Sequence, residues 1–248
     1  MDRRTLLKSM AAAGAMAGGL AGTAMAADRE TLPLIKPKRL EKGMTVGLIA
    51  PAGASNNRQQ VLHAIDVLKS LGYRVKEGNN LYRRTQYLAG TDLERAEDIN
   101  WAFSDPEVDA VFTLHGGYGT MRTLPYLDYE MIRKNPKIVI GYSDITGLLL
   151  GIHAKTGLAT FHGPCGVSTF SEYTLDEYKK VVVNPSKTAA IGAPPVKEYP
   201  EGQAERANRI MSFHGGKGRG RLIGGNLSLV SPLVGTPYLP DMDGAILF

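Results

Sequence analysis

Short apolar runs alternate with amphipathic segments of helical period over the first two thirds of the chain. The first run, residues 45–50, is closed by Pro51 and has the length and apolar character of a buried strand. A poorer run follows at 73–76, and two further apolar runs occupy 109–114 and 137–140. Strands that are apolar on both sides need a layer of helices on each face of their sheet. The alternation therefore predicts an α/β fold with a Rossmann-like or flavodoxin-like parallel sheet and helices on both faces.

The segments between these runs have the periodicity and the end signals of helices. Thr91 and Glu94 are spaced as a capping box that begins one helix, and Asp105-Pro106 ends it. A long apolar helix is predicted over residues 145–153. In open parallel sheets, ligands bind beyond the carboxyl ends of the strands. The loops at 115–120 and 141–144, which follow the third and fourth runs, are therefore the expected site.

The alternation stops near Pro164, and the rest of the chain differs in character. Residues 184–220 are rich in Pro, Gly, Lys and Asn, which favours irregular structure. An apolar strand is predicted at 244–248, and the chain stops inside it, so we expect the sequence to be cut short. The predicted organisation is a signal peptide at 1–26, a lead-in at 27–44, the α/β domain at 45–165, an irregular linker at 166–220, and at 221–248 the start of an incomplete second, β-rich α/β domain.

Ser143 lies in the second of the expected site loops, within the sequence Gly-Tyr-Ser-Asp. A serine at a sharp strand-to-helix turn exposes its hydroxyl above the sheet, beside the free N–H groups of the helix start. Ile145 stands where the G-x-S-x-G pattern of nucleophilic serines has its second glycine. The alternative is an ordinary helix cap, in which Ser143 or Asp144 accepts hydrogen bonds from the backbone. The residues alone leave both interpretations open.

The glycines at 116–119, in the first site loop, also have two interpretations. One is a close approach of the backbone to a ligand, with a free N–H aimed at a carbonyl oxygen, and the other is a tight turn. Their spacing differs from that of the G-x-G-x-x-G pattern. Neither a dinucleotide-binding loop nor a phosphate-binding loop is predicted.

A serine nucleophile needs a base, usually a histidine that a carboxylate orients. His115 and His162 fall at strand ends on the expected site face, where either could reach Ser143. Neither has a clearly placed carboxylate, so these residues do not assemble a complete triad. The other histidines are His63 and His153, in predicted helices, and His214.

Five motifs follow one another at residues 112–119, 140–146, 160–164, 224–229 and 235–238. Together they resemble the LD-carboxypeptidase family, serine peptidases that trim muramoyl tetrapeptides, and the resemblance extends from about Lys36 to Phe248. It implies a Ser–Glu–His triad with Ser143 as nucleophile, and oxyanion donors at the backbone of Asp144 and Gly117. It implies no metal or organic cofactor, and the family commonly forms homodimers.

Two departures from the family pattern bear on the site. The family usually has arginine where this chain has His115. The family's Glu and His follow the strand that begins at Gly244, whereas this chain ends at Phe248. We therefore expect the 248-residue chain to be inactive as it stands, because a serine without its base is a poor nucleophile. Neither His115 nor His162 is assigned as the missing base.

The first 26 residues resemble a twin-arginine export signal. The arginines at 3–4 are followed by Thr, two Leu and Lys, and an Ala- and Gly-rich stretch then ends in a small-x-small sequence at 24–26. The alternative is an uncleaved membrane anchor, but Ala and Gly partition poorly into lipid and the stretch is short for a span of ~20 residues. We expect export to the periplasm and no stable membrane anchor.

Composition narrows the class of protein further. The chain is 43% hydrophobic and 21% charged, as in globular proteins with a sizeable core. Without residues 1–26 it has 26 basic and 23 acidic residues, scattered along the sequence, so nucleic-acid binding is not predicted. Cys165 is the single cysteine. It has no partner for an intramolecular disulfide, and no Cys/His cluster has the spacing of a zinc site.

The function predicted from these features is that of an exported serine carboxypeptidase acting on muropeptides. It would hydrolyse the bond between an L-configured centre and the terminal D-alanine of a muramoyl tetrapeptide. One alternative is a peptidase of the same fold that inactivates a peptidyl-nucleotide antibiotic as self-immunity. The other is a non-catalytic periplasmic protein that binds muropeptides.

Overall fold

The computed structural model describes residues 32–195, 201–202 and 211–248. The predicted signal peptide at 1–26 and the first part of the lead-in lie outside these residues. Within the described ranges, no helix is long and apolar enough to cross a membrane.

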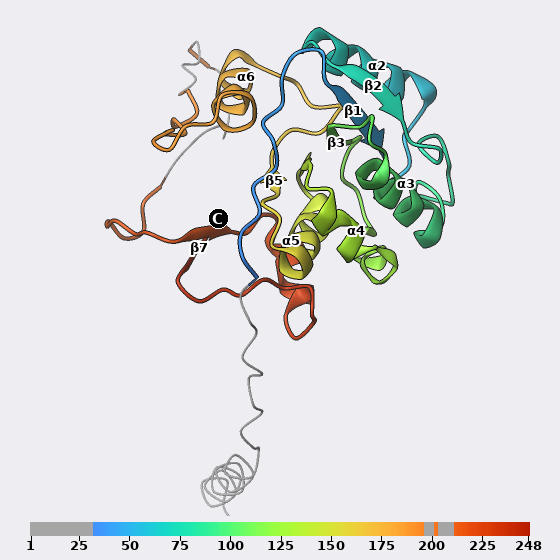
Figure 1. The fold of residues 1–248 in the computed structure, drawn as a ribbon. Coiled ribbons are helices and arrows are strands. Elements are labelled where there is room, and N and C mark those ends of the chain that lie inside the picture. Colours follow the sequence, from blue (N-terminus) through green and yellow to red (C-terminus); the bar gives the residue numbers. More distant parts are fainter. Residues whose placement is uncertain (1–31, 196–200, 203–210) are drawn as a thin grey trace, which may run out of the picture. The chain divides into compact units, whose positions relative to one another are not determined.

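Five parallel strands form the central sheet in the order β2-β1-β3-β4-β5 (Figure 1). In the register of the sheet, Leu48 of β1 lies between Glu77 of β2 and Phe112 of β3. This is the flavodoxin-like order, in which the strand order reverses between β1 and β3. The predicted parallel sheet is confirmed. The strands are β1 Thr45–Ile49, β2 Arg74–Glu77, β3 Ala110–Thr113, β4 Ile138–Gly141 and β5 Phe161–His162.

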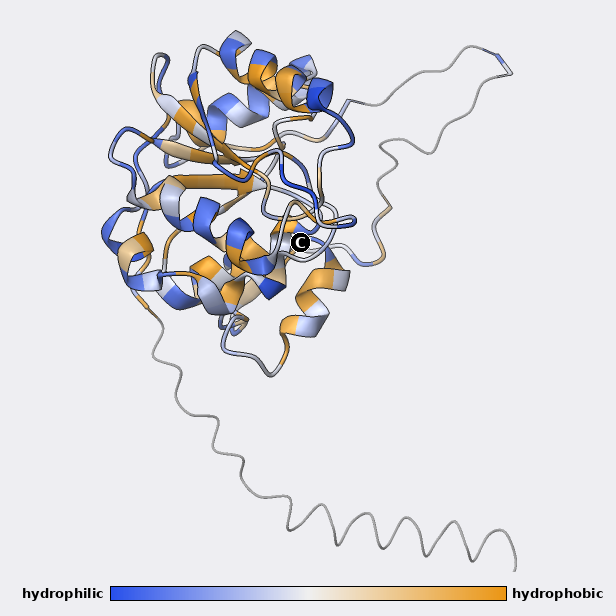
Figure 2. Ribbon diagram, turned by 90° about the vertical axis from the view of Figure 1, so that its right-hand side faces the viewer, coloured by the Kyte–Doolittle hydropathy of each residue, from blue (hydrophilic) through white to orange (hydrophobic). Residues whose placement is uncertain are grey.

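Alternate residues of the inner strands point to opposite faces of the sheet, and each face has its own core. Leu48 and Phe112 belong to a core that α2 and α6 cover. Ile49 and Val111 belong to a second core, which α3, α4 and α5 cover. Figure 2 shows hydrophobic strands lying between helices that carry hydrophilic residues. Helices on both faces are therefore confirmed. The α-helices are α2 Arg58–Ser70, α3 Asp92–Ser104, α4 Tyr129–Lys134, α5 Ile145–Thr156, α6 Glu172–Tyr178 and α7 Leu227–Val230.

The predicted helix signals act where the sequence places them. Thr91 Oγ1 accepts a hydrogen bond from Glu94 N at 3.2 Å, and Glu94 Oε2 accepts one from Thr91 N at 2.8 Å. This capping box begins α3, which ends directly before Asp105. Helix α5 begins at Ile145 as predicted and runs to Thr156, three residues beyond the predicted end.

The prediction of an irregular linker over 166–220 is wrong for part of that range. Helix α6 and a π-helical turn, η3 Lys179–Val183, occupy it. Tyr178 and Val182 are buried in the core that covers one face of the sheet. The prediction rested on the composition of 184–220, and in the described part of that stretch the chain has neither helix nor strand.

The C-terminal segment forms a two-stranded parallel sheet from β6 Arg221–Ile223 and β7 Ala245–Leu247. The apolar strand predicted at 244–248 is thereby confirmed. The 3-10 turn η4, Ser231–Leu233, follows α7 between these strands. Asn226 N donates to Thr146 Oγ1 at 3.0 Å, which ties this segment to the first turn of α5.

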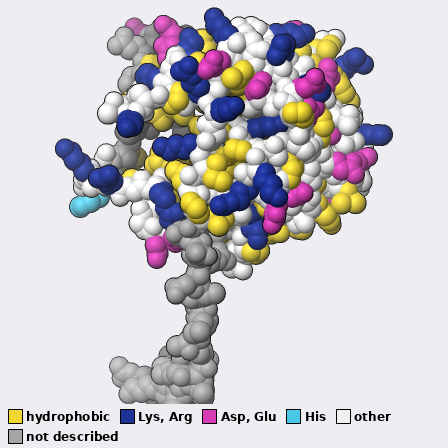
Figure 3. Space-filling model, in the orientation of Figure 1, with side chains coloured by type: hydrophobic (Ala, Val, Ile, Leu, Met, Phe, Trp, Pro, Cys, Tyr) yellow, Lys and Arg dark blue, Asp and Glu magenta, His cyan; other side chains and the backbone are white. Residues whose placement is uncertain are grey.

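Charged side chains of both signs are mixed over the face that Figure 3 presents. Lysine and arginine lie among acidic and apolar side chains there, without gathering into one stripe. A continuous basic stripe is the feature that a nucleic-acid backbone would require.

Asp98 gives the fold a testable dependence on pH. This residue of α3 is buried and accepts hydrogen bonds from Asn80 N, at 3.0 Å to Oδ2 and 3.1 Å to Oδ1. Burial disfavours the carboxylate and raises the pKa of Asp98 to about 6. The folded state then binds the proton more tightly than the unfolded state, so stability from this group is present below pH 4 and is lost as the pH rises to 6.

We expect the free energy of unfolding of the wild type, relative to that of Asp98→Asn, to fall by about 2 kcal/mol between pH 4 and pH 6. Urea unfolding of both proteins at several pH values measures this difference. The variant cancels the contributions of all other carboxylates, because it retains them. Parallel stability profiles for the two proteins would contradict the prediction.

Candidate active site

Ser143 lies at the turn between β4, which ends at Gly141, and α5, which begins at Ile145. Its φ angle is 63°, in the left-handed region, which costs a residue other than glycine ~1–3 kcal/mol. A Cβ atom at Gly141 would lie 2.8 Å from Cγ2 of Ile145. Glycine at this position therefore allows the tight turn, and the partly exposed Ser143 side chain lies at its apex.

The helix-cap interpretation of this turn is wrong. Asp144 is the N-cap residue of α5, but its side chain caps no backbone N–H of that helix. Its Oδ2 accepts a hydrogen bond from Thr120 N at 2.9 Å instead. Among the described residues, none is hydrogen-bonded to Ser143 Oγ. The serine hydroxyl is thus free of a structural role in capping.

The glycine loop at 116–119 packs directly against this turn. A Cβ atom at Gly116 would lie 2.9 Å from Ser143 Cβ and 3.2 Å from Ser143 Oγ. Gly117 has φ 123°, and a Cβ atom there would lie 3.0 Å from Gly53 N. These glycines form a tight turn that lets the backbone approach the serine, and their approach to a ligand stays a prediction.

Two backbone donors close to Ser143 are unused in the described part of the chain. Neither Gly117 N nor Asp144 N donates a hydrogen bond to a described acceptor. Asp144 N begins the helix, where the dipole favours negative charge. Free N–H groups near a serine hydroxyl are the elements of an oxyanion hole.

The loop after β1 is a third element of this region, which sequence reasoning did not include. Gly53 N donates to Gly116 O at 3.2 Å. The site loops therefore follow β1, β3 and β4, three neighbouring strands, and surround the point where the strand order reverses.

The two candidate histidines do not hydrogen-bond to Ser143. His115 has Nδ1 2.8 Å from Gly116 O, and its buried Nε2 has no hydrogen-bond partner. The ring of His162 lies edge-on to that of Phe248, with centroids 5.6 Å apart, and burial lowers the pKa of His162. Of the other histidines, His63 and His153 lie on α2 and α5 as predicted, and His214 is exposed.

Cys165 contacts the backbone of the turn that carries Ser143. Its Sγ lies 3.4 Å from Thr113 Oγ1, which donates to Ile140 O at 3.0 Å, and it accepts a hydrogen bond from the N–H of Tyr142. Burial raises the pKa of the Cys165 thiol. A buried thiol with a raised pKa is inert, so this cysteine has a packing role.

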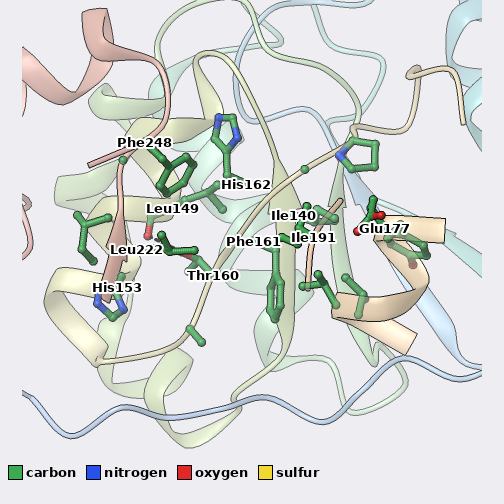
Figure 4. A pocket seen from close by; sticks show the side chains of 18 of the residues that line it. Ile140, Leu149, His153, Thr160, Phe161, His162, Glu177, Ile191, Leu222 and Phe248 are labelled. Carbon is green, nitrogen blue, oxygen red and sulfur yellow. Dashed lines mark hydrogen bonds between the residues drawn. The ribbon is translucent and has the colours of Figure 1, made fainter. Parts of the chain in front are cut away.

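A separate cavity of about 750 Å³ runs along β5 (Figure 4). Apolar side chains such as Leu149, Phe161 and Leu222 form its walls, and His162 and Glu177 supply polar atoms. Ser143 and the glycine loop do not line it. In the described residues, no group of three or more His, Cys, Asp or Glu side chains could hold a metal ion.

Sequence reasoning missed Arg95 and Thr120. Arg95 is fully buried and donates to the backbone of two site loops, and Thr120 is bonded to Asp144. Arg95 follows Asp92 by three residues on α3, which in a sequence resembles an exposed ion pair. Its place beside Ala96, on the apolar face of the helix, is the one signal that could have marked it.

Comparison with known proteins identifies the family. Residues 46–163 match the N-terminal domain of LD-carboxypeptidases, and residues 219–248 match the C-terminal domain. The chain belongs to the LD-carboxypeptidase family. The resemblance stated from the sequence motifs is thereby confirmed, and the first matched range contains Ser143 and all three site loops.

Three relatives illustrate the range of this LD-carboxypeptidase family. The probable murein peptide carboxypeptidase of Bacillus subtilis is 41% identical over 218 residues, which are 86% of this chain and 64% of that protein. The microcin C7 self-immunity protein MccF of Escherichia coli is 33% identical over 230 residues, 84% of this chain and 67% of that protein. The crystal structure of an MccF-like protein from Bacillus anthracis matches with a TM-score of 0.72 and 31% identity, over 86% of this chain and 69% of that one. The chain thus spans just under two thirds of the length of the B. subtilis relative.

The left-handed backbone of Ser143 predicts an unusual order of stabilities in the 248-residue chain. Glycine adopts this conformation without cost, whereas alanine retains the strain. We expect Ser143→Gly to be about 1 kcal/mol more stable than Ser143→Ala, as measured by urea unfolding. At Ser104, an exposed residue of α3, glycine should bring no such gain over alanine, because the backbone there is helical and alanine adopts it without strain. Equal stabilities of the two Ser143 variants would contradict the strained turn.

Proposed function

We propose that the protein is a serine carboxypeptidase that removes the terminal D-alanine from muramoyl tetrapeptides, with Ser143 as its nucleophile. The observation that carries the proposal is the strained turn at Ser143, where, among the described residues, the serine hydroxyl and the nearby N–H groups of Gly117 and Asp144 have no hydrogen-bond partner. Family membership and the name of the B. subtilis relative, a murein peptide carboxypeptidase, support the substrate class.

The proposed reaction follows from the positions of these groups. Ser143 Oγ attacks the carbonyl carbon of the peptide bond before D-alanine, and its proton passes to a base. The tetrahedral oxyanion accepts hydrogen bonds from Asp144 N and Gly117 N. Collapse of this intermediate breaks the C–N bond, the leaving amine takes the proton, and D-alanine departs. Water then attacks the acyl-enzyme and releases the tripeptide.

This reaction needs a base, and none of the described residues is hydrogen-bonded to Ser143 as such a base. The family resemblance implies a Glu–His pair, and neither member is assigned within these 248 residues. His115 is held by its own loop and His162 packs on Phe248, which gives no reason to assign either of them as the base.

A second candidate is the hydrolysis of a peptidyl-nucleotide antibiotic as self-immunity. The similarity to the MccF protein favours it, and the bond cleavage would use the same serine and the same oxyanion donors. Export would count against this function, because such antibiotics act in the cytoplasm. A third candidate, a non-catalytic muropeptide binder, would bind its ligand without reacting with a fluorophosphonate probe at Ser143.

For the proposed peptidase, Ser143→Ala should reduce release of D-alanine from a tetrapeptide by about 10⁶-fold, as for an essential member of a serine triad. The measurement uses the gene product read through to its stop codon, with D-alanine quantified by an enzyme-coupled assay. Ser104→Ala, an exposed serine on α3, is the matched control and should retain full activity. Near-normal activity of Ser143→Ala would exclude this serine as the nucleophile.

We further propose that the protein is exported to the periplasm by the twin-arginine route, because of the paired arginines at 3–4 and the small-x-small sequence at 24–26. Replacing both arginines with lysine should leave the precursor in the cytoplasm, since this route requires the arginine pair. Immunoblots of periplasmic and cytoplasmic fractions measure the distribution. An unchanged periplasmic yield would contradict the route, and a mature N-terminus at Ala27 would identify the cleavage site.

A further inference from the structure

Arg95 is a buried cation that holds two loops of the site at once. It is 1% exposed, and its Nη1 donates to Pro51 O at 2.7 Å and to Gly119 O at 2.8 Å. Pro51 follows β1 and Gly119 belongs to the loop after β3. A single guanidinium therefore fixes the spacing of these loops, because its donors form a rigid, planar fork.

The groups around Arg95 stabilise its charge and hold its side chain in position. Its Nη2 donates to Asp92 Oδ1, and the second oxygen of Asp92 accepts from Arg122 Nε at 3.0 Å. Burial lowers the pKa of Arg95, and Asp92 opposes that shift. Gly119 has φ 104°, and a Cβ atom there would lie 3.1 Å from Arg95 Nη1. The loop can approach the guanidinium this closely only with glycine at that position.

Thr120 ties the same loop to the residue after Ser143. Thr120 N donates to Asp144 Oδ2 at 2.9 Å, and Thr120 Oγ1 donates to Asp144 O at 2.6 Å. Both residues are at most 1% exposed. Gly147 of α5 leaves the necessary room, since a Cβ atom there would lie 3.0 Å from Thr120 Oγ1.

We propose that Arg95, Thr120 and the Asp144 carboxylate form a loop clamp that positions the two oxyanion donors relative to Ser143. The clamp fixes Gly117 N through the loop that ends at Gly119 and Thr120, and fixes Asp144 N through the bonds to Thr120. Oxyanion donors act only when they are preorganised around the developing charge, and a misplacement of ~1 Å can cost ~10²-fold in rate. Arg95 and Thr120 are thus positioning residues, which do not touch the substrate, and this inference rests on the proposed function.

The decisive test uses a set of threonine variants of the gene product read through to its stop codon. Thr120→Val removes the bond to Asp144 O with little change in shape and should lower kcat by ~10–10²-fold, with KM within about threefold, because the lost interaction acts in the transition state. Thr120→Ser retains a hydroxyl and should restore kcat. Thr123→Val is the matched control. Thr123 is equally buried, but its hydroxyl bonds to Thr120 O, within its own turn, at 2.7 Å, so this variant should retain kcat.

A second measurement needs no substrate. Arg95→Lys keeps the charge but lacks the planar fork. The amide of Thr120, which donates to Asp144 Oδ2, should therefore exchange its hydrogen at least about tenfold faster than in the wild-type 248-residue chain, while exchange in the strands of the sheet stays unchanged. This result would support the clamp even if the wild-type gene product released no D-alanine, an outcome that would count against the proposed function alone.

Three results would overturn the loop clamp. The first is an unchanged kcat in Thr120→Val. The second is an equal loss of kcat in Thr120→Val and Thr123→Val, which would indicate a general effect of losing a buried hydroxyl. The third is unchanged amide exchange at Thr120 in a folded Arg95→Lys protein.

Discussion

The left-handed backbone of Ser143 is the constraint around which the rest of the site is arranged. The turn from β4 to α5 is sharp enough to require glycine at position 141, and Gly116 leaves room for the serine on its other side. Strain of this kind persists only where the surrounding structure over-determines it. Here the buried strand, the long apolar helix and the Asp144–Thr120 bonds supply that support. The fold thereby presents a serine hydroxyl to which no described group is hydrogen-bonded.

Strand order explains why the supporting loops meet at this serine. Because β3 lies between β1 and β4 in the parallel sheet, the carboxyl ends of all three strands lie together at one edge. The loop after the middle strand contacts both of its neighbours, through Gly53 N to Gly116 O and through Thr120 to Asp144. Arg95 reaches the same edge from α3. The sheet thus brings together groups that are distant in the sequence. Arg95 and Pro51, for example, are 44 residues apart.

Local sequence was sufficient to predict the sheet, the capping box of α3 and the turn at Ser143, because strand runs, glycines and helix signals act over a few residues. The role of Arg95 could not be predicted in this way. Its burial depends on two loops that close over it, and an Asp–Arg pair spaced by three on a helix gives no sign of that. Helix α6 was missed because the composition of the segment after it dominated the interpretation. A base for Ser143 was not found in the described residues, and the sequence did not assign one.

In the proposed mechanism, Gly117 N and Asp144 N together stabilise the oxyanion of an acyl-transfer reaction at Ser143. A crystal structure of the gene product, read through to its stop codon and treated with a phosphonate analogue that ends in D-alanine, tests this claim most directly. We predict phosphorus bonded to Ser143 Oγ, with one phosphonyl oxygen about 3 Å from both nitrogen atoms. A phosphonate on another residue, or an oxygen held by other groups while these two N–H groups stay unbonded, would contradict the account.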